Sequence, residues 1–165
     1  MEPNVEKEIA AGNRLLQEGD LKGALSRFNK AAKLDPNCAE AYFGIAEASL
    51  GIPKVSVEQI LTAYKKAIEL DGKNPYYYSA YGSFCLENGL YKDAEDAYQR
   101  AAELDPENSI YYLSELSVEY FRNAISKLDE EASNKEYEAI LKKTMEYFLK
   151  ALNITKEDAV RLLSQ

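Results

Sequence analysis

Small and aromatic residues recur along the chain in a fixed order that predicts a series of helices. A small residue is followed four positions later by an aromatic residue, and three positions after that by Ala. The copies are Ala24, Phe28 and Ala31; Ile60, Tyr64 and Ala67, with Ile in the small position; Ala94, Tyr98 and Ala101; and, more weakly, Thr144, Phe148 and Ala151. Offsets of four and seven place each set on one helix face, and a Pro or Gly beyond the last Ala ends the first three helices.

A second set of small residues precedes the first three of these helices and predicts a partner helix for each. These upstream segments contain Gly12, Ala46 and Gly82. Gly19 and Gly89 stand between partners, where glycine adopts the positive φ that closes a helix C-terminus. Each unit is therefore predicted to be a helix hairpin. The last Ala of the four sets falls at positions 31, 67, 101 and 151, so the period is 34 residues with two insertions.

This pattern resembles the tetratricopeptide repeat, a 34-residue helix hairpin. The third repeat carries the resemblance best, through Tyr78, Tyr81, Gly82, Gly89, Ala94, Tyr98, Ala101 and Pro106. The resemblance implies an all-α fold, a right-handed superhelix of antiparallel helix hairpins, in a single domain over residues 1–165. We expect repeats over residues 5–38, 39–74 and 75–108, a divergent unit over 109–154 and a capping segment over 155–165.

The last repeat departs most from the pattern, because Glu115 and Leu116 stand where a small pair is expected. We predict one helix from Ser109 to about Glu131 and a partner from Lys135 to Asn153. A final helix over 156–163 should begin with a capping-box signal at Thr155. It would cover the apolar end that a repeat array leaves open.

The longer last hairpin also bears on the oligomeric state. Its large apolar residues include Tyr120, Phe121, Leu141, Met145 and Phe148. If they are mostly core, the protein is a monomer, whereas an exposed patch of several of them would indicate a symmetric dimer through that end. We expect a monomer.

Composition removes most enzymatic chemistry. The 165 residues contain no histidine, and no phosphate-binding glycine loop or nucleophile elbow occurs, so we expect neither an enzyme nor a bound cofactor. Cys38 and Cys85 form no CxxC pair, and the acidic run from Asp129 lacks the order of a calcium loop, so we expect no metal. We expect the two cysteines to be buried thiols and the acidic run to be a solvated turn.

Charge and the N-terminal residues suggest where the protein acts. A net charge of −8 disfavours nucleic acid and anionic membrane surfaces as partners, and no basic groove accompanies the cluster of tyrosines from Tyr76 to Tyr81. The first residues contain no apolar export segment. We therefore expect a cytoplasmic protein whose partner is neither nucleic acid nor membrane.

In the family that the pattern resembles, the first helices of successive hairpins line a concave groove. The residues at groove positions that we expect to bind a partner are Ile9, Asn13, Glu40, Phe43, Glu47, Tyr76, Ser79, Ser83, Leu113 and Ser117. Members that grip a C-terminal carboxylate use Lys, Arg and Asn at positions matched here by Ile9, Asn13, Gly44, Tyr76 and Ala80, and only Asn13 agrees. Without cations the groove cannot replace the hydration of a carboxylate, so we expect no carboxylate-clamp co-chaperone.

The remaining groove chemistry favours a different ligand. Phe43, Tyr76, Ile9 and Leu113 offer apolar contact, while Glu40 and Glu47 offer negative charge. We expect a protein-interaction module that binds a basic or amphipathic peptide or helix, with apolar anchors beside Lys or Arg. The alternative is a structural or self-associating scaffold without a peptide ligand.

Overall fold

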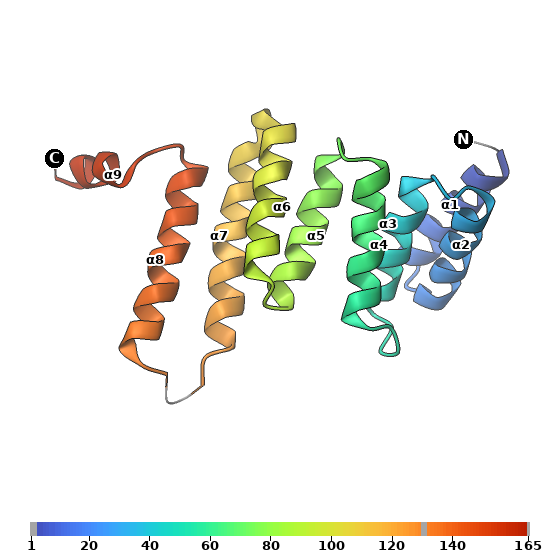
Figure 1. Cartoon of the computed structure of the whole chain (residues 1–165), viewed down its shortest axis with the longest axis horizontal. Helices are drawn as coiled ribbons and strands as arrows, with labels where there is room; N and C mark the ends of the chain where they lie inside the picture. Colours follow the sequence, from blue (N-terminus) through green and yellow to red (C-terminus); the bar gives the residue numbers. More distant parts are fainter. Residues whose placement is uncertain (1–2, 130–131, 165) are drawn as a thin grey trace. The chain divides into compact units, whose positions relative to one another are not determined.

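The computed structural model describes residues 3–129 and 132–164, with only the backbone of Leu162 and Leu163. The described residues form nine α-helices, one short 3-10 helix and no strand (Figure 1). The helices are α1 (Pro3–Gln17), α2 (Leu21–Leu34), α3 (Ala39–Ser49), α4 (Val57–Leu70), α5 (Pro75–Glu87), α6 (Tyr91–Leu104), α7 (Ser109–Ser126), α8 (Asn134–Ala151) and α9 (Lys156–Leu163), with the 3-10 turn at Pro106–Asn108. The all-α prediction is confirmed.

The chain divides into two compact units, which we call the N-terminal unit (Met1–Tyr77) and the C-terminal unit (Tyr78–Gln165). In the N-terminal unit α1 pairs with α2 and α3 pairs with α4, while α2 and α1 both contact α3. In the C-terminal unit α7 pairs with α8 and packs against α6. These helix pairs confirm the predicted antiparallel hairpins.

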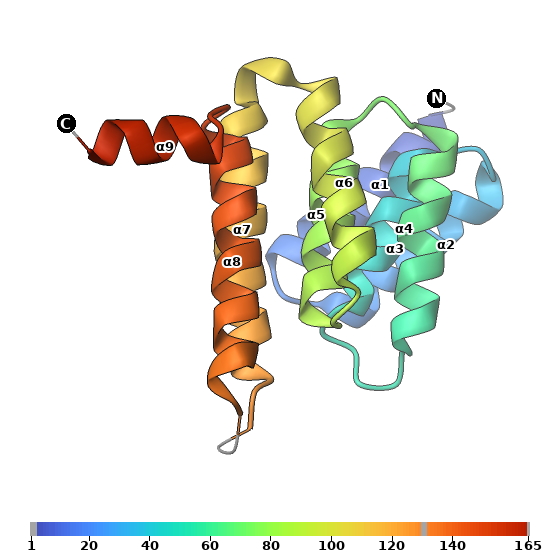
Figure 2. The same ribbon diagram turned by 60° about the vertical axis from the view of Figure 1, so that its left-hand side comes forward.

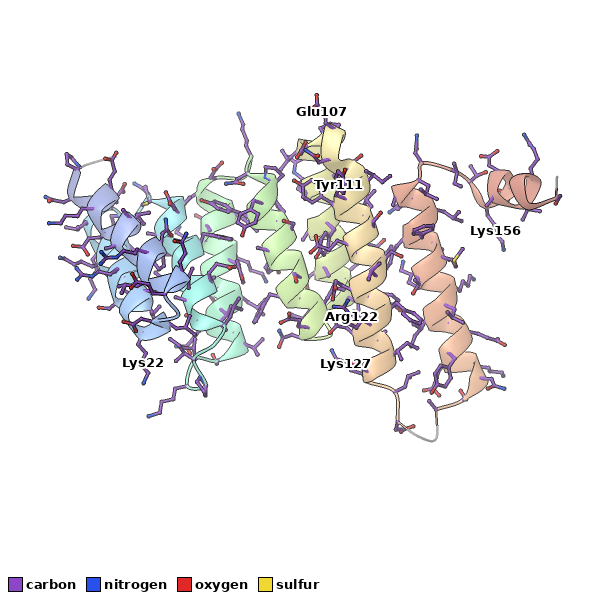
Figure 3. The ribbon with its side chains drawn as sticks, turned by 180° about the vertical axis from the view of Figure 1, so that it is seen from behind. Lys22, Glu107, Tyr111, Arg122, Lys127 and Lys156 are labelled. Atoms are coloured by element: carbon purple, nitrogen blue, oxygen red, sulfur yellow. The ribbon has the colours of Figure 1, made fainter. Side chains whose placement is uncertain are left out.

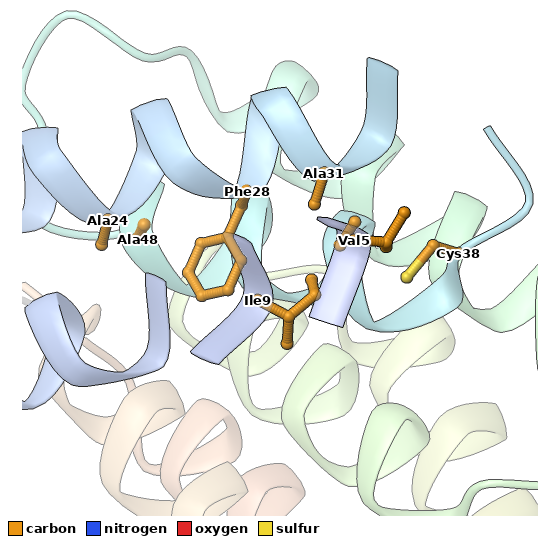
Figure 4. Packing of buried hydrophobic residues seen from close by; sticks show 8 residues of the cluster. Val5, Ile9, Ala24, Phe28, Ala31, Cys38 and Ala48 are labelled. Atoms are coloured by element: carbon orange, nitrogen blue, oxygen red, sulfur yellow. The ribbon is translucent and has the colours of Figure 1, made fainter. Parts of the chain in front are cut away.

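The core of the N-terminal unit lies between α1, α2 and α3 (Figure 4). It contains Val5, Ile9, Ala24, Phe28, Ala31, Cys38, Ala41 and Ala48, all buried. Phe28 is fully buried, and its ring lies between two glycines, Gly12 of α1 and Gly44 of α3. A Cβ on Gly12 would stand 2.7 Å from this ring, so the absence of a side chain is what lets α2 approach α1 this closely. The small residues of the repeat are therefore steric requirements.

An ion pair crosses the first hairpin beside this core. Glu8 of α1 is buried, and its carboxylate accepts hydrogen bonds from Lys30 Nζ at 2.6 Å and Arg27 Nη1 at 3.1 Å. These hydrogen bonds, first from Lys30 and then from Arg27, hold the pKa of Glu8 below its usual value. Two cations on α2 thus offset the cost of burying one carboxylate on α1.

The C-terminal unit repeats the same construction. Gly82 of α5 lies against Tyr98 of α6, where an added Cβ would stand 2.8 Å from the ring. Leu113 of α7, Ala102 of α6 and Ala151 of α8 form a second buried cluster. Glu95 of α6 ties in α8, because its carboxylate accepts from Tyr147 Oη at 3.0 Å and pairs with Lys143 at 3.3 Å and Lys150 at 3.8 Å.

The last hairpin is shorter than predicted. The helix expected to reach about Glu131 ends at Ser126, where Lys127 N and Leu128 N donate to Ala124 O and Ile125 O and tighten the final turn. Glu130 and Glu131 lie outside the described residues.

Its partner helix begins one residue earlier than predicted. The partner, α8, starts at Asn134, capped by Ser133 and Glu136, and ends at Ala151 rather than Asn153, which has a positive φ of 53°. The predicted helix α9 is present, and Thr155 and Asp158 form its capping box.

Candidate functional site

A groove in the N-terminal unit gathers half of the predicted site residues. It has a volume of about 450 Å³ and is lined by Asn13, Leu16, Glu40, Phe43, Gly44, Glu47, Asn74, Tyr76 and Tyr77. The groove lies along α1 and α3 and is bounded by the first turn of α5. Of the ten predicted residues it brings together Asn13, Glu40, Phe43, Glu47 and Tyr76.

Aromatic rings form the apolar part of this groove. The half-buried ring of Phe43 stands 5.3 Å from the ring of Tyr76, 4.6 Å from Tyr77 and 5.9 Å from Tyr64, measured between centroids. Tyr77 is buried and stacks on Phe43, whereas Tyr76 keeps 59% of its surface exposed. Phe43 and Tyr76 therefore offer aromatic surface to a ligand, held in place from below by Tyr77.

Consecutive positions on α5 give the two tyrosines these different roles. Neighbouring residues on a helix point about 100° apart, so Tyr77 turns under Phe43 while Tyr76 stays at the rim. The side chain of Asn74 accepts a hydrogen bond from Tyr76 N at 3.1 Å at the start of this helix. The helix start thereby fixes the position of Tyr76.

Two carboxylates supply the charge of the groove. Glu47 Oε1 accepts a hydrogen bond from Tyr64 Oη at 2.5 Å, and Glu40 Oε1 accepts one from Asn13 Nδ2 at 3.2 Å. Burial raises the pKa of Glu47, and the hydrogen bond from Tyr64 opposes that shift. Among the described lining residues none is Lys or Arg, so the groove presents net negative charge beside an aromatic pair.

The other predicted residues lie elsewhere. Ile9 is only 5% exposed and packs in the core beside Phe28, because α1 turns this residue toward both α2 and α3. Its side chain is therefore not offered to the groove. Leu113 and Ser117 of the C-terminal unit are buried as well, and Ser117 Oγ donates to Thr144 O at 3.0 Å. Ser79 and Ser83 are half-buried residues of the same unit.

Four lining residues were not among the predicted binding residues: Leu16, Gly44, Asn74 and Tyr77. Asn74 precedes Pro75 and caps its helix, and Asn before a helix-starting Pro is a readable signal. Leu16 lies at the end of α1, beyond the groove positions that the repeat defines. The repeat pattern has no position that would identify it.

A larger hollow lies on the side of α2 in the same unit, with a volume of about 770 Å³. Its lining is Leu15, Asp20, Gly23, Ser26, Arg27, Asn29, Lys30 and Lys33. Two of these cations already pair with Glu8, and Leu15 is its one large apolar residue. Binding sites are lined mainly by apolar and aromatic groups, so the smaller aromatic groove is the better candidate.

Within residues 3–129 and 132–164, no group of three or more His, Cys, Asp and Glu residues could hold a metal ion. None of the described helices is long and apolar enough to cross a membrane. Cys38 and Cys85 are buried free thiols, and burial raises the pKa of Cys38.

Comparison with known families decides the classification. Residues 12–50 match a family model described as TPR repeat, and residues 61–109 match one described as Tetratricopeptide repeat. Together the two matches cover more than half of the chain. The chain belongs to the tetratricopeptide repeat family. No curated protein matches the sequence as a relative.

Solved TPR structures share the fold. A crystal structure of MamA aligns with a TM-score of 0.69 and 23% identity, over 96% of this chain and 82% of MamA. The TPR2B domain of yeast Sti1, in complex with pHsp70, aligns at 0.66 with 20% identity, over 76% of this chain and 100% of the domain. The Yersinia enterocolitica type III secretion translocator chaperone SycD aligns at 0.63 with 17% identity, over 78% and 98%. At these identities the similarity establishes the fold alone.

Proposed function

We propose that the groove of the N-terminal unit binds a basic, amphipathic segment of a partner protein. The TPR fold supports a protein-interaction module in general, and the TPR2B domain of Sti1 forms a complex with pHsp70. The observation that carries the finer proposal is the ring pair of Phe43 and Tyr76, 5.3 Å apart, beside two carboxylates.

The apolar anchor of the ligand would lie against this ring pair. Phe43 is packed on its other sides against Tyr64 and Tyr77. Ligand binding would therefore cost little conformational entropy of the Phe43 side chain. Rigid aromatic side chains of this kind supply much of the binding energy at interfaces. An aliphatic or aromatic side chain of the partner fits a groove of about 450 Å³.

The charge of the groove selects what flanks that anchor. Glu47 and Glu40 line the same groove as Phe43, so a Lys or Arg next to the anchor meets a carboxylate. A ligand carboxylate would meet no cation among the described lining residues. The proposed ligand is therefore basic, and the groove is not a carboxylate clamp.

A peptide selection tests this proposal without a known partner. A random peptide library would be selected on the full chain and counter-selected on the Tyr76→Ala variant. We expect enriched peptides that carry Lys or Arg close to a large apolar residue. The two should lie within one turn of each other in a helical peptide, or within two residues in an extended one. Enrichment of acidic peptides, or of the same peptides on both proteins, would contradict the proposal.

Affinities of one selected peptide then locate its site. Tyr76→Ala and Phe43→Ala should each weaken binding about tenfold or more, because losing a buried aromatic anchor costs about 2 kcal/mol. Tyr111→Ala is the matched control, since Tyr111 is an exposed tyrosine outside the groove lining. Glu47→Lys should act mainly by slowing association and should reduce its salt dependence.

A further inference from the structure

The last hairpin exposes apolar side chains in two regular rows. On α8 and directly after it they follow each other at intervals of three or four residues, and on α7 three more lie eight and three residues apart on one side of the helix. Together they form what we call the end face: Ile110, Val118, Phe121, Tyr137, Leu141, Met145, Phe148 and Leu152, which expose between 38% and 53% of their surface. The sequence indicates a dimer if several of five large apolar residues of this hairpin are exposed. Four of them, Phe121, Leu141, Met145 and Phe148, are exposed.

Both rows lie on the same side of the hairpin. The contact between α7 and α8 is marked by Ser117, which donates to Thr144 O, and by the rings of Tyr120 and Tyr147, 5.4 Å apart. In each helix the exposed row follows this contact row by one residue, a turn of about 100° in the same sense. Because the two helices are antiparallel, that turn brings both rows to the same face.

The end face points away from the rest of its unit. The opposite side of α8 is tied to α6, because Lys143, Lys150 and Tyr147 all reach Glu95. Tyr111 and Arg122, both largely exposed, are side chains of α7 (Figure 3). The end face is thus the uncovered end of the helix stack within the C-terminal unit.

Helix α9 does not cover this face. In two views it projects sideways, away from both α7 and α8 (Figures 1 and 2), and its Val160 is 57% exposed. Its eight residues span about 12 Å, whereas the row from Tyr137 to Leu152 extends about 22 Å at 1.5 Å per residue. Even folded back, α9 would leave the half of the face near Tyr137 and Phe121 open.

We propose that two copies of this chain pair through the end face. With about 200 Å² for each large side chain, the exposed fractions amount to roughly 700 Å² of apolar surface per copy. That exceeds the largest apolar patch of an ordinary monomer, about 300–600 Å². It approaches the roughly 800 Å² that each partner buries in a stable complex.

The local distribution of charge makes the end face the suitable place for a second copy. The chain carries a net charge of −8, so two copies repel, and this repulsion is weakest where the facing surfaces themselves carry little net charge. The two rows contain no charged residue, and their borders carry both signs, with Arg122 on α7 and Glu138 and Lys142 on α8. In a two-fold dimer the same surface of both copies meets. A border with charges of both signs allows opposite charges of the two copies to face each other. No carboxylate lies within the rows to select a basic partner, in contrast to the groove.

Sedimentation velocity of the full chain over a range of concentrations tests the proposal. We expect a reversible dimer that persists in about 1 M salt, since screening removes the repulsion and leaves apolar contact intact. Leu141→Glu with Met145→Glu should weaken dimerisation at least tenfold, and circular dichroism should show an intact helical fold because both side chains are about half exposed. A wild-type chain that stays monomeric at about 100 µM, well above the μM range of weak specific interfaces, would overturn the proposal.

Two controls separate the end face from other effects. Val57→Glu adds one negative charge, half of what the double variant adds, at an exposed apolar residue of α4 and should leave the dimer intact. Met145→Lys lowers the net negative charge and should still weaken the dimer. Phe43→Ala, which removes the groove anchor, should dimerise like the wild type, so failure of the peptide proposal would leave this one standing. A dimer that survives the double Glu variant would refute the end face as its site.

Discussion

The ring of Phe43 stacks on the ring of Tyr77, with centroids 4.6 Å apart and ring planes 17° from parallel. The same Phe43 ring stands 5.3 Å from Tyr76, which is largely exposed. One residue of α3 thus contacts a buried and an exposed tyrosine that are adjacent in sequence. Phe43 therefore takes part both in the packing of the unit and in the proposed ligand site, whereas Tyr76 lies mainly at the surface.

This arrangement predicts that Phe43 contributes to both stability and peptide binding, whereas Tyr76 contributes mainly to binding. Phe43→Ala should lower the free energy of unfolding by about 1–3 kcal/mol, because it removes packing against three aromatic rings. Tyr76→Ala should change it by about 0.5 kcal/mol or less, as surface substitutions do. Both should weaken peptide binding. Urea denaturation measures the difference, and equal losses of stability would contradict this division.

A second prediction concerns the two glycines that enclose Phe28. Gly12→Ala should destabilise the chain by about 1–3 kcal/mol, because its Cβ would stand 2.7 Å from a ring that has no room to move. In a Phe28→Leu background the same substitution should cost less, since the smaller side chain relieves the clash. Thermal melts of the four proteins give this coupling. Additive effects would mean that the ring is not the obstacle.

A third prediction uses the fully buried alanines of the repeat. Ala31 and Ala101 have no exposed surface, so Ala→Leu at either should overpack its hairpin and cost about 1–3 kcal/mol. Ala10, on the exposed side of α1, is the matched control, and Ala10→Leu should leave stability nearly unchanged. Melting temperatures decide the matter, and an Ala101→Leu variant as stable as the wild type would rule out tight packing there.

The helices and the core could be predicted from the sequence because a repeat encodes contacts that are close along the chain. Phe28, Ala31 and Gly12 pack within their own or the adjacent hairpin, so their spacing alone located the helices and the core. The helix end at Ser126 was not predicted, because no Pro or Gly marks it and the chain closes there with backbone hydrogen bonds. The capping-box signal at Thr155, in contrast, coincides with a helix start in the structure.

The candidate site was harder to predict for a related reason. Repeat positions give the side of a helix that a residue occupies, and Phe43, Glu47 and Tyr76, which share that side, line one groove in the structure. They do not give the angle at which neighbouring helices pack, which decides whether a residue on that side is exposed. Ile9 shares its repeat position with a groove residue, yet it is core because α1 contacts both α2 and α3.

A fourth prediction follows from the ion pairs of Glu8. The folded-state pKa of Glu8 lies below its unfolded value, so its stabilising contribution is present above the unfolded pKa and is lost as pH falls through the folded one. Glu8→Gln should therefore lower the melting temperature at neutral pH, and the difference from wild type should shrink below about pH 4. Glu6→Gln, on the exposed side of α1, is the matched control and should melt like wild type throughout. A difference independent of pH would show that the ion pairs are not its source.

The last prediction joins Glu47 to the proposed ligand. Burial raises the pKa of Glu47, so its carboxyl takes up a proton at a higher pH than the usual value of about 4.3. A cation of the ligand prefers the carboxylate, and affinity for a selected basic peptide should fall as pH is lowered through that raised pKa. The same shift makes the fold itself more stable as Glu47 is protonated, so lost binding in this range cannot be ascribed to unfolding through this group.

Fluorescence anisotropy of the labelled peptide between about pH 4 and pH 7 measures this effect across the range where carboxyl groups titrate. Glu47→Gln removes the titrating group, so it should weaken binding at neutral pH and flatten the profile. Glu40→Gln removes the other groove carboxylate, which should weaken binding while leaving the midpoint of the profile where the wild type has it. If Glu47→Gln keeps the full pH dependence, the ligand's cation does not lie at Glu47.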